Sequence, residues 1–173
     1  MIQLLNWFQT TYPHLKQELL ESHHNFDNSD TNPYHVEGDC WSHTMMVCKV
    51  AQLKGYDRVV QVSALLHDIG KPKSRKINPR NNYVNFHGHE ELSAIMAKPL
   101  VDDLVARAML TQDEADEVVE LIALHSFLYR HSQEEIEEYF KDKPKLFKHL
   151  SELSECDDLG RFSETMREIK YNI

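Results

Sequence analysis

Histidine and aspartate side chains recur along this chain in positions that suit metal binding. Residues 62 to 72 read Val-Ser-Ala-Leu-Leu-His-Asp-Ile-Gly-Lys-Pro, so an apolar stretch leads directly into His67 and Asp68. Gly70 and Pro72 are typical of the end of a helix. We therefore expect a helix to end where this pair is displayed. Both side chains can reach one ion only if it lies beside the helix end.

Other metal-ligand candidates stand in separate segments that are predicted to be helical. They are His43, His89, His125 and one of Asp157 or Asp158. A mixed set of imidazoles and carboxylates suits a divalent ion such as Mn²⁺, Fe²⁺, Co²⁺, Ni²⁺ or Mg²⁺. A closed structural zinc site fits less well, because the cysteines lack finger spacing. Asp68 could bridge two ions, since a carboxylate has two oxygens. Two such ions can bind the attacking and the leaving oxygen of a phosphoryl displacement.

A basic segment follows the His67-Asp68 pair. No acidic residue lies between Asp68 and Glu90, and the basic residues there include Lys71, Lys73, Arg75, Lys76 and Arg80. Lys71 and Lys73 are the predicted phosphate contacts, with Arg161 as a third candidate, because a phosphate dianion requires charge-assisted hydrogen bonds. Neither lysine is expected to bind an ion, because a protonated amine has no lone pair. The alternative is a solvated loop that binds no ligand.

Apolar periodicity predicts an all-α helical bundle around these residues. Helices are expected over residues 2–9, 13–22, 41–53 and 57–69, from His87 with a break or kink near Pro99, over 112–126, near 134–138, over 144–156, and from Ser163. Residues 76–86 are expected to form a short β-hairpin.

The connections and helix ends carry further expectations. Residues 25–39 are predicted to be a loop that could contribute to the rim of a site. Ser42 is a candidate N-cap, and Asp57 is expected to cap the next helix. Three N-terminal histidines are expected to be solvated surface residues, namely His14, His23 and His24.

Composition limits the classes of protein that remain. The 173 residues suggest a single domain over 1–173, with a core at about 35–165 and helical additions at both ends. No apolar run is long enough to span a bilayer, the N-terminus does not resemble a signal peptide, and three cysteines suggest reduced thiols, so we expect a cytoplasmic protein without a membrane partner. The net charge of −9 argues against tight, non-specific nucleic-acid binding, but not against a small phosphorylated substrate. The oligomeric state is left open.

The order of these motifs resembles the HD-domain metal-dependent phosphohydrolase superfamily. The resemblance rests on His43 in Trp-Ser-His-Thr, on His-Asp-Ile-Gly-Lys-Pro at 67–72, on His-Gly-His-Glu at 87–90, and on Asp157 in Asp-Asp-Leu-Gly-Arg. It covers roughly residues 35 to 165. The sequence is most similar in appearance to the HD domains of bacterial tRNA nucleotidyltransferases and of bacterial RNA end-healing kinases.

The resemblance implies an all-α fold with a first ion held by His43, His67, Asp68 and Asp157. Asp157 is chosen over Asp158 because it precedes Gly160 at the family's spacing. In members with a second ion, the positions of His89 and His125 complete the site. Some relatives have two adjacent histidines where this chain has His125-Ser126, so one or two ions are expected. The nucleotidyltransferase and kinase domains of those relatives are missing, and their activities are not implied.

The predicted function is hydrolysis of a phosphomonoester or cyclic phosphodiester of a nucleotide or RNA end by metal-activated water. Asp68, His87 and His125 are the catalytic candidates. Either histidine could donate a proton to the leaving oxygen, or could instead be a ligand or support one. Two alternatives remain open: a nucleotidase or cyclic-(di)nucleotide phosphodiesterase acting on free nucleotides, and a regulatory HD domain with little catalysis.

Overall fold

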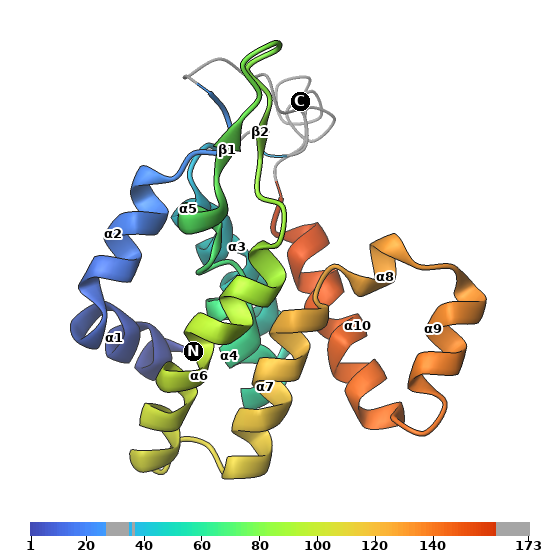
Figure 1. Cartoon of the computed structure of the whole chain (residues 1–173). Helices are drawn as coiled ribbons and strands as arrows, with labels where there is room; N and C mark the ends of the chain where they lie inside the picture. The colour runs from blue at the N-terminus through green and yellow to red at the C-terminus, as the bar shows by residue number, and fades with distance from the viewer. Residues whose placement is uncertain (27–34, 36, 162–173) are drawn as a thin grey trace, which may run out of the picture.

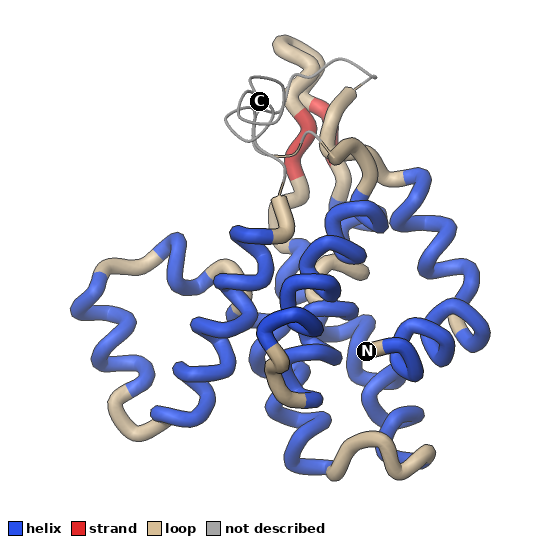
Figure 2. Tube along the Cα trace, turned by 180° about the vertical axis from the view of Figure 1, so that it is seen from behind, coloured by secondary structure: helices blue, strands red, loops and turns tan. Residues whose placement is uncertain are grey.

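The structure, a computed structural model, describes residues 1–26, 35 and 37–161. Its described part is helical apart from one small hairpin, which confirms the all-α prediction (Figures 1 and 2). The helices are α1 (Ile2–Thr11), α2 (Pro13–Glu21), α3 (Cys40–Lys54), α4 (Arg58–Leu66), α5 (Lys71–Ser74), α6 (His89–Ala106), α7 (Gln112–Leu124), α8 (Phe127–Arg130), α9 (Gln133–Phe140) and α10 (Pro144–Leu159). That all 173 residues form one domain stays a prediction.

Helix α4 lies at the centre of the bundle. Most of its side chains are buried, from Val59 to Leu66, because the helix packs against α3, α7 and α10 (Figure 1). Helices α6 and α7 pack together beside it. Burial of apolar side chains is the main stabilising contribution in such a bundle, at roughly 25 cal/mol per Å². The central helix thus provides a rigid base for the residues that follow it, His67 and Asp68.

The first two helices form a layer over one side of the bundle. Phe8 of α1 stacks on Trp41 of α3, with ring centroids 5.8 Å apart and planes 9° from parallel. The indole N–H of Trp7 donates to Asp103 of α6 over 2.7 Å. These contacts attach the N-terminal layer to two helices that carry candidate ligands.

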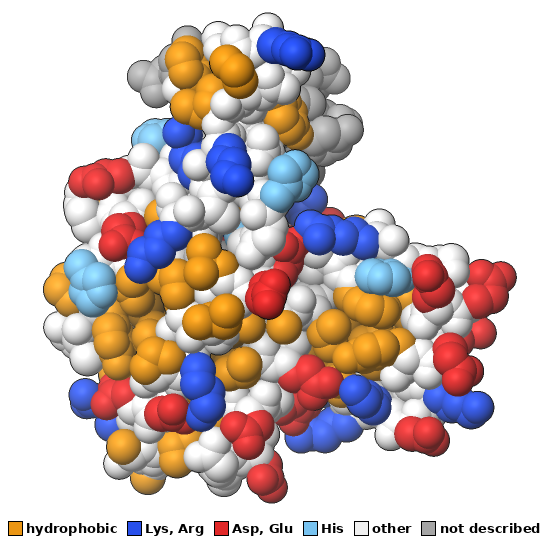
Figure 3. Space-filling view, in the orientation of Figure 1, with side chains coloured by type: hydrophobic (Ala, Val, Ile, Leu, Met, Phe, Trp, Pro, Cys, Tyr) orange, Lys and Arg blue, Asp and Glu red, His pale blue; other side chains and the backbone are white. Residues whose placement is uncertain are grey.

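The hairpin predicted within 76–86 is confirmed. Strands β1 (Lys76–Ile77) and β2 (Val84–Asn85) pair antiparallel and project from one end of the bundle (Figures 1 and 2). On the face shown in Figure 3, Lys and Arg side chains lie on and below this projection, whereas acidic side chains are numerous over α9. The basic stretch of the sequence thus becomes a basic surface at one end of the molecule.

Several predicted helix ends required correction. The side chain that caps α3 is Asp39 rather than Ser42, and Asp39 accepts from the Ser42 N–H over 2.7 Å. The cap at Asp57 is confirmed. Helix α4 ends at Leu66 rather than at residue 69, and α6 continues as one helix through Pro99. The helix predicted from Ser163 and most of the loop at 25–39 lie outside the described residues.

Gly70 was predicted as a helix stop, but its backbone has an ordinary φ of −83°. Its absent side chain matters for a different reason. A Cβ atom here would lie 2.6 Å from the backbone nitrogen of Ser93 and 2.8 Å from the carbonyl oxygen of His89. The Gly70 N–H also donates to Ser93 Oγ over 2.9 Å. The glycine therefore allows the start of α6 to approach the end of α4.

All three cysteines are free and buried. Burial raises the pKa of Cys40 and that of Cys156 to about 12, so both thiols stay protonated near neutral pH. Among the described helices, none combines the length and apolar character needed to cross a bilayer.

Candidate metal centre

The structure brings together all six predicted metal ligands from five parts of the chain. His43 lies in the first turn of α3, and Asp157 lies in the last turn of α10. His67 and Asp68 follow α4, His89 begins α6, and His125 follows α7. All are buried except His89, whose side chain is 12% exposed. The helix ends therefore converge on one buried point.

Asp68 lies between two groups of candidate ligands. Its Oδ2 is 3.2 Å from Nε2 of His67 and 3.6 Å from Nε2 of His43. Its Oδ1 is 3.3 Å from Nε2 of His89 and 3.8 Å from Nε2 of His125. Each oxygen thus faces a different pair of imidazoles, as a bridging carboxylate would.

The two groups each have the composition of an ion site. One contains His43, His67 and Asp157, and the other contains Asp68, His89 and His125. Within each group the ligand atoms lie within 4.8 Å of one another. The Oδ1 atom of Asp157 is 2.9 Å from Nε2 of His43. Each group therefore offers imidazole and carboxylate donors, a set that suits divalent transition ions.

The rings of three of the histidines are oriented by the same kind of hydrogen bond to the backbone. The Nδ1–H groups of His67, His89 and His125 donate to the carbonyl oxygens three residues earlier, over 3.0, 2.8 and 2.6 Å respectively. A ring whose Nδ1 carries the proton has its Nε2 lone pair available. The local fold at each helix end therefore sets the tautomer that an ion requires.

Buried atoms at this centre lack well-aligned hydrogen-bond partners, and this observation tests whether an ion fits. Both oxygens of Asp68, Nε2 of His67 and both ring nitrogens of His43 are in this state. The Nε2 atoms of His89 and His125 face each other at 3.1 Å. Buried polar groups are normally paired, because an unpaired one costs free energy. Divalent ions would coordinate these oxygen and nitrogen atoms, so the residues present fit the expected cofactor.

The protonation states of Asp68, Asp157 and His125 suit ion binding, whereas His43 must lose a proton to bind an ion. Burial alone would raise the pKa of Asp68, but His67 and Lys71 hold it well below its usual value. Asp157 behaves likewise beside His43. Burial lowers the pKa of His125 to about 4, which leaves a neutral imidazole. Burial opposes the charged form of His43, but Asp157 and Glu37 raise its pKa to about 9.

The predicted phosphate contacts separate into two environments. Lys71 is buried, and its Nζ lies 2.6 Å from Oδ2 of Asp68. Lys73 is exposed and lines a different depression, beside Glu18 and Glu21. Arg161 donates to Oδ2 of Asp157 over 2.6 Å, so its guanidinium holds a candidate ligand in place. Lys71 thus contacts Asp68 directly, whereas Arg161 contacts Asp157.

A cavity of about 240 Å³ opens beside the metal centre, below the hairpin. Its lining includes Lys71 and His89 from the centre, the exposed His87, and Arg130 of α8. Arg130 also forms an ion pair with the buried Glu90. His87 therefore lies at the cavity wall, whereas His125 lies beside Asp68.

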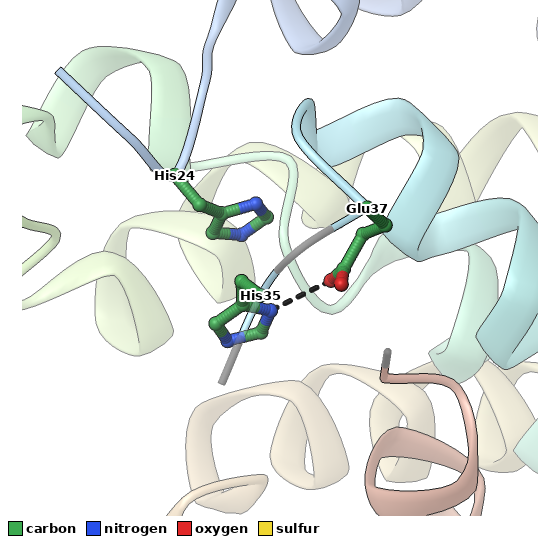
Figure 4. Close-up of side chains that lie close together, drawn as sticks. All are labelled: His24, His35 and Glu37. Carbon is green, nitrogen blue, oxygen red and sulfur yellow. Dashed lines mark hydrogen bonds and ion pairs between the residues drawn. The ribbon is translucent and has the colours of Figure 1, made fainter. Parts of the chain in front are cut away.

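The sequence interpretation missed three residues next to the centre. His24, expected on the surface, is only 2% exposed, and the prediction that it is solvated was wrong. His35 and Glu37 lie in the segment predicted to be a loop, and Figure 4 shows them beside His24. No spacing pattern identified these residues, because they lie outside the helices and strands. His14 and His23 are exposed as expected.

An all-α bundle with a buried centre of histidines and aspartates fits a helical domain that could hold a metal ion. The family model described as HD domain matches residues 40–158. The chain therefore belongs to the HD domain family, which implies the metal-dependent phosphohydrolase superfamily. The resemblance that the motifs predicted is confirmed.

Related proteins match a part of the chain. It is 38% identical over 71 residues to the Multifunctional CCA protein of Burkholderia cenocepacia (strain HI2424), which is 41% of this chain and 16% of the relative. It is 28% identical over 105 residues to the Multifunctional CCA protein of Legionella pneumophila (strain Paris), which is 61% of this chain and 24% of the relative. The matched segments are thus a quarter or less of either relative's length.

Proposed function

We propose that this chain hydrolyses a phosphomonoester or a cyclic phosphodiester of a nucleotide or RNA end. The observation that carries the proposal is the position of Asp68, with one oxygen toward each ligand group and a basic cavity beside it. Bound divalent ions supply an activated water and neutralise charge on phosphoryl oxygens. Membership of the HD domain family and similarity to the Multifunctional CCA proteins support this choice.

The chain's own residues have distinct tasks in this reaction. Asp68 and Asp157, with the four histidines His43, His67, His89 and His125, hold one or two ions such as Mn²⁺, Co²⁺, Ni²⁺, Fe²⁺ or Mg²⁺. Lys71, paired with Asp68, and Arg130, paired with Glu90, line the cavity and offer charge-assisted donors to a phosphate group. His87 lines the same cavity and is positioned to donate a proton to a leaving oxygen. His125, with its lone pair toward Asp68, fits a ligand role better than an acid role.

A panel of substrates tests the proposal. Purified protein is incubated with 2′-, 3′-, 5′- and 2′,3′-cyclic phosphates of nucleotides and of short RNA, each with several divalent ions. We expect turnover of at least one member, loss of that turnover in EDTA, and recovery with Mn²⁺, Co²⁺ or Ni²⁺. Undiminished turnover in the chelator would refute the metal mechanism.

The same panel separates the alternatives. Preference for free nucleotides or cyclic dinucleotides over RNA ends would favour a nucleotidase or phosphodiesterase. Ion binding without turnover of any substrate would favour a regulatory domain. The cytoplasmic location and the absence of tight nucleic-acid binding stay predictions.

A further inference from the structure

His43 is held differently from the other histidines of the metal centre. Its Nδ1 lies 3.1 Å from Oε1 of Glu37 without a well-aligned hydrogen bond, whereas the Nδ1–H groups of the other three donate to backbone carbonyls. Its Nε2 faces Asp157 and Asp68. When Nε2 binds an ion, Nδ1 must carry the proton, and a nearby carboxylate is then its natural acceptor.

Glu37 is itself fixed from its other side. The Nδ1–H of His35 donates to the same Oε1 atom over 2.7 Å (Figure 4). The Glu37 side chain is only 2% exposed. The Glu37 carboxylate therefore lies between two imidazoles.

His24 completes this arrangement. Its ring stacks on that of His35, with centroids 4.1 Å apart and planes 7° from parallel. His24 Nδ1–H donates to the Gly38 carbonyl over 3.2 Å, and its Nε2 accepts from Lys71 over 3.3 Å. Because both ring nitrogens are engaged, the His24 ring is a fixed platform for His35.

The same three residues could instead hold a further ion, since each offers a ligand atom within 4.8 Å of the others. The ring geometry argues against this. The lone pair of an imidazole nitrogen lies in the ring plane, so an ion bound by two imidazoles must lie near both planes. Parallel rings stacked 4.1 Å apart share no such position. The His24–His35–Glu37 cluster is thus better explained as support for a neighbour.

We propose that Glu37 is a positioning residue of the metal centre, which fixes the tautomer and rotation of His43 by accepting its Nδ1–H. His35 holds Glu37, and His24 holds His35. Carboxylate partners of this kind raise the basicity of a ligating histidine, and their loss typically weakens metal affinity by about 10- to 100-fold. The inference rests on the proposed ligand role of His43 and not on any particular substrate.

Metal affinity of the metal-free protein tests this inference. Affinity for Co²⁺ and the number of ions bound per chain are measured by competition with a chelator. Glu37→Gln should weaken affinity about 10- to 100-fold without changing the number of ions bound, and His35→Asn should weaken it less. Glu138→Gln is the matched control, since the Glu138 side chain is 80% exposed, and should bind as wild type does.

A tautomer measurement distinguishes positioning from general packing. In the zinc-loaded protein, NMR should show a hydrogen-bonded Nδ1 proton on His43, and this signal should move upfield in Glu37→Gln. Wild-type affinity in Glu37→Gln would overturn the inference. A second result would also overturn it. If His24→Asn and His35→Asn each bind one ion fewer, and the remaining ions bind with unchanged affinity, the cluster is itself an ion site.

Two features keep the test decisive. Circular dichroism in EDTA shows whether Glu37→Gln is folded. If it is not, His35→Asn decides, because the His35 side chain is 15% exposed and contributes less to the core. No substrate is involved, so failure here leaves the proposed hydrolysis to its own panel.

Discussion

At the scale of single residues, Asp68 is bound to two kinds of partner. It faces the imidazoles of both ligand groups, and it also neutralises the buried ammonium of Lys71. A buried charge that loses its partner destabilises a protein by about 3–5 kcal/mol. Substitution of Asp68 is therefore expected to lower the free energy of unfolding as well as metal binding and activity. Substitution of His67 should lower metal binding and activity without this loss of stability.

His67→Ala is expected to abolish hydrolysis and reduce bound metal while the helical signal survives. Asp68→Ala should do the same with a lower free energy of unfolding, because Lys71 is left unpaired. The double variant Asp68→Ala/Lys71→Met should recover stability but not metal. Elemental analysis and thermal unfolding in EDTA measure these effects. If both single variants keep wild-type metal content and activity, the centre has been assigned wrongly.

Lys71 and Lys73 form a natural matched pair for testing phosphate recognition. Lys71 lines the cavity beside Asp68, so Lys71→Ala should lower kcat/KM by about ten- to a hundredfold with metal content intact. Lys73 faces another depression, and Lys73→Ala should change kcat/KM little. Steady-state kinetics on the best substrate of the panel decide. Equal values for wild type and both variants would favour a loop without a role in binding.

The residues that sequence could identify were those with a pattern. His67, Asp68 and His89 stand in short motifs at helix boundaries, and the structure places them together. Glu37 and His24 stand in polar segments without periodicity, so nothing in the sequence relates them to His43 or Lys71. Their positions depend on backbone hydrogen bonds between the described ends of the α2–α3 connection, from His24 to Gly38 and from Cys40 to Ser22.

At the scale of elements, the approach of α6 to the end of α4 sets the spacing between ligands. Gly70→Ala would place a methyl group against the backbone at Ser93 and His89, so the start of α6 must move. We expect a loss of about 1–3 kcal/mol in the free energy of unfolding and weaker binding at the group containing His89. Denaturant unfolding and metal titration measure both.

Gly55→Ala is the control for this substitution. Gly55 has a φ of +70° and no atom within 4 Å of an added Cβ, so alanine there costs backbone strain of about 1–2 kcal/mol without a steric clash. Its metal affinity should equal that of the wild type. Equal affinity in Gly70→Ala would show that α6 tolerates the shift.

Helix existence was predictable from apolar spacing, but helix ends were not. The central helix was expected to reach residue 69 and ends at Leu66, because a tight turn at 67–70 displays the His67-Asp68 pair. Asp39 outcompetes Ser42 as the cap of α3 by accepting from its N–H and hydroxyl. Such choices depend on local hydrogen bonds that periodicity does not encode.

At the scale of the whole molecule, ion binding is coupled to folding. Each candidate ligand group joins helices that are distant in the sequence, so an ion bound there favours the folded arrangement of those helices. A ligand that binds only the folded state stabilises it by mass action, by about 2.7 kcal/mol at 100 times its Kd. Thermal midpoints should therefore fall in EDTA and rise with Mn²⁺, Co²⁺ or Ni²⁺ more than with Ca²⁺. Identical midpoints in all conditions would contradict this coupling.

The contact between Phe8 and Trp41 gives the molecule an optical reporter. Trp41 lies two residues before His43 on α3, and the other tryptophan of the chain, Trp7, lies in the N-terminal layer that packs on it. Tryptophan emission therefore reports on this corner, while circular dichroism reports on all the helices. Paramagnetic ions at the centre should quench emission from Trp41. On heating, detachment of the N-terminal layer should shift the tryptophan emission maximum to longer wavelength before the helical signal of the bundle is lost.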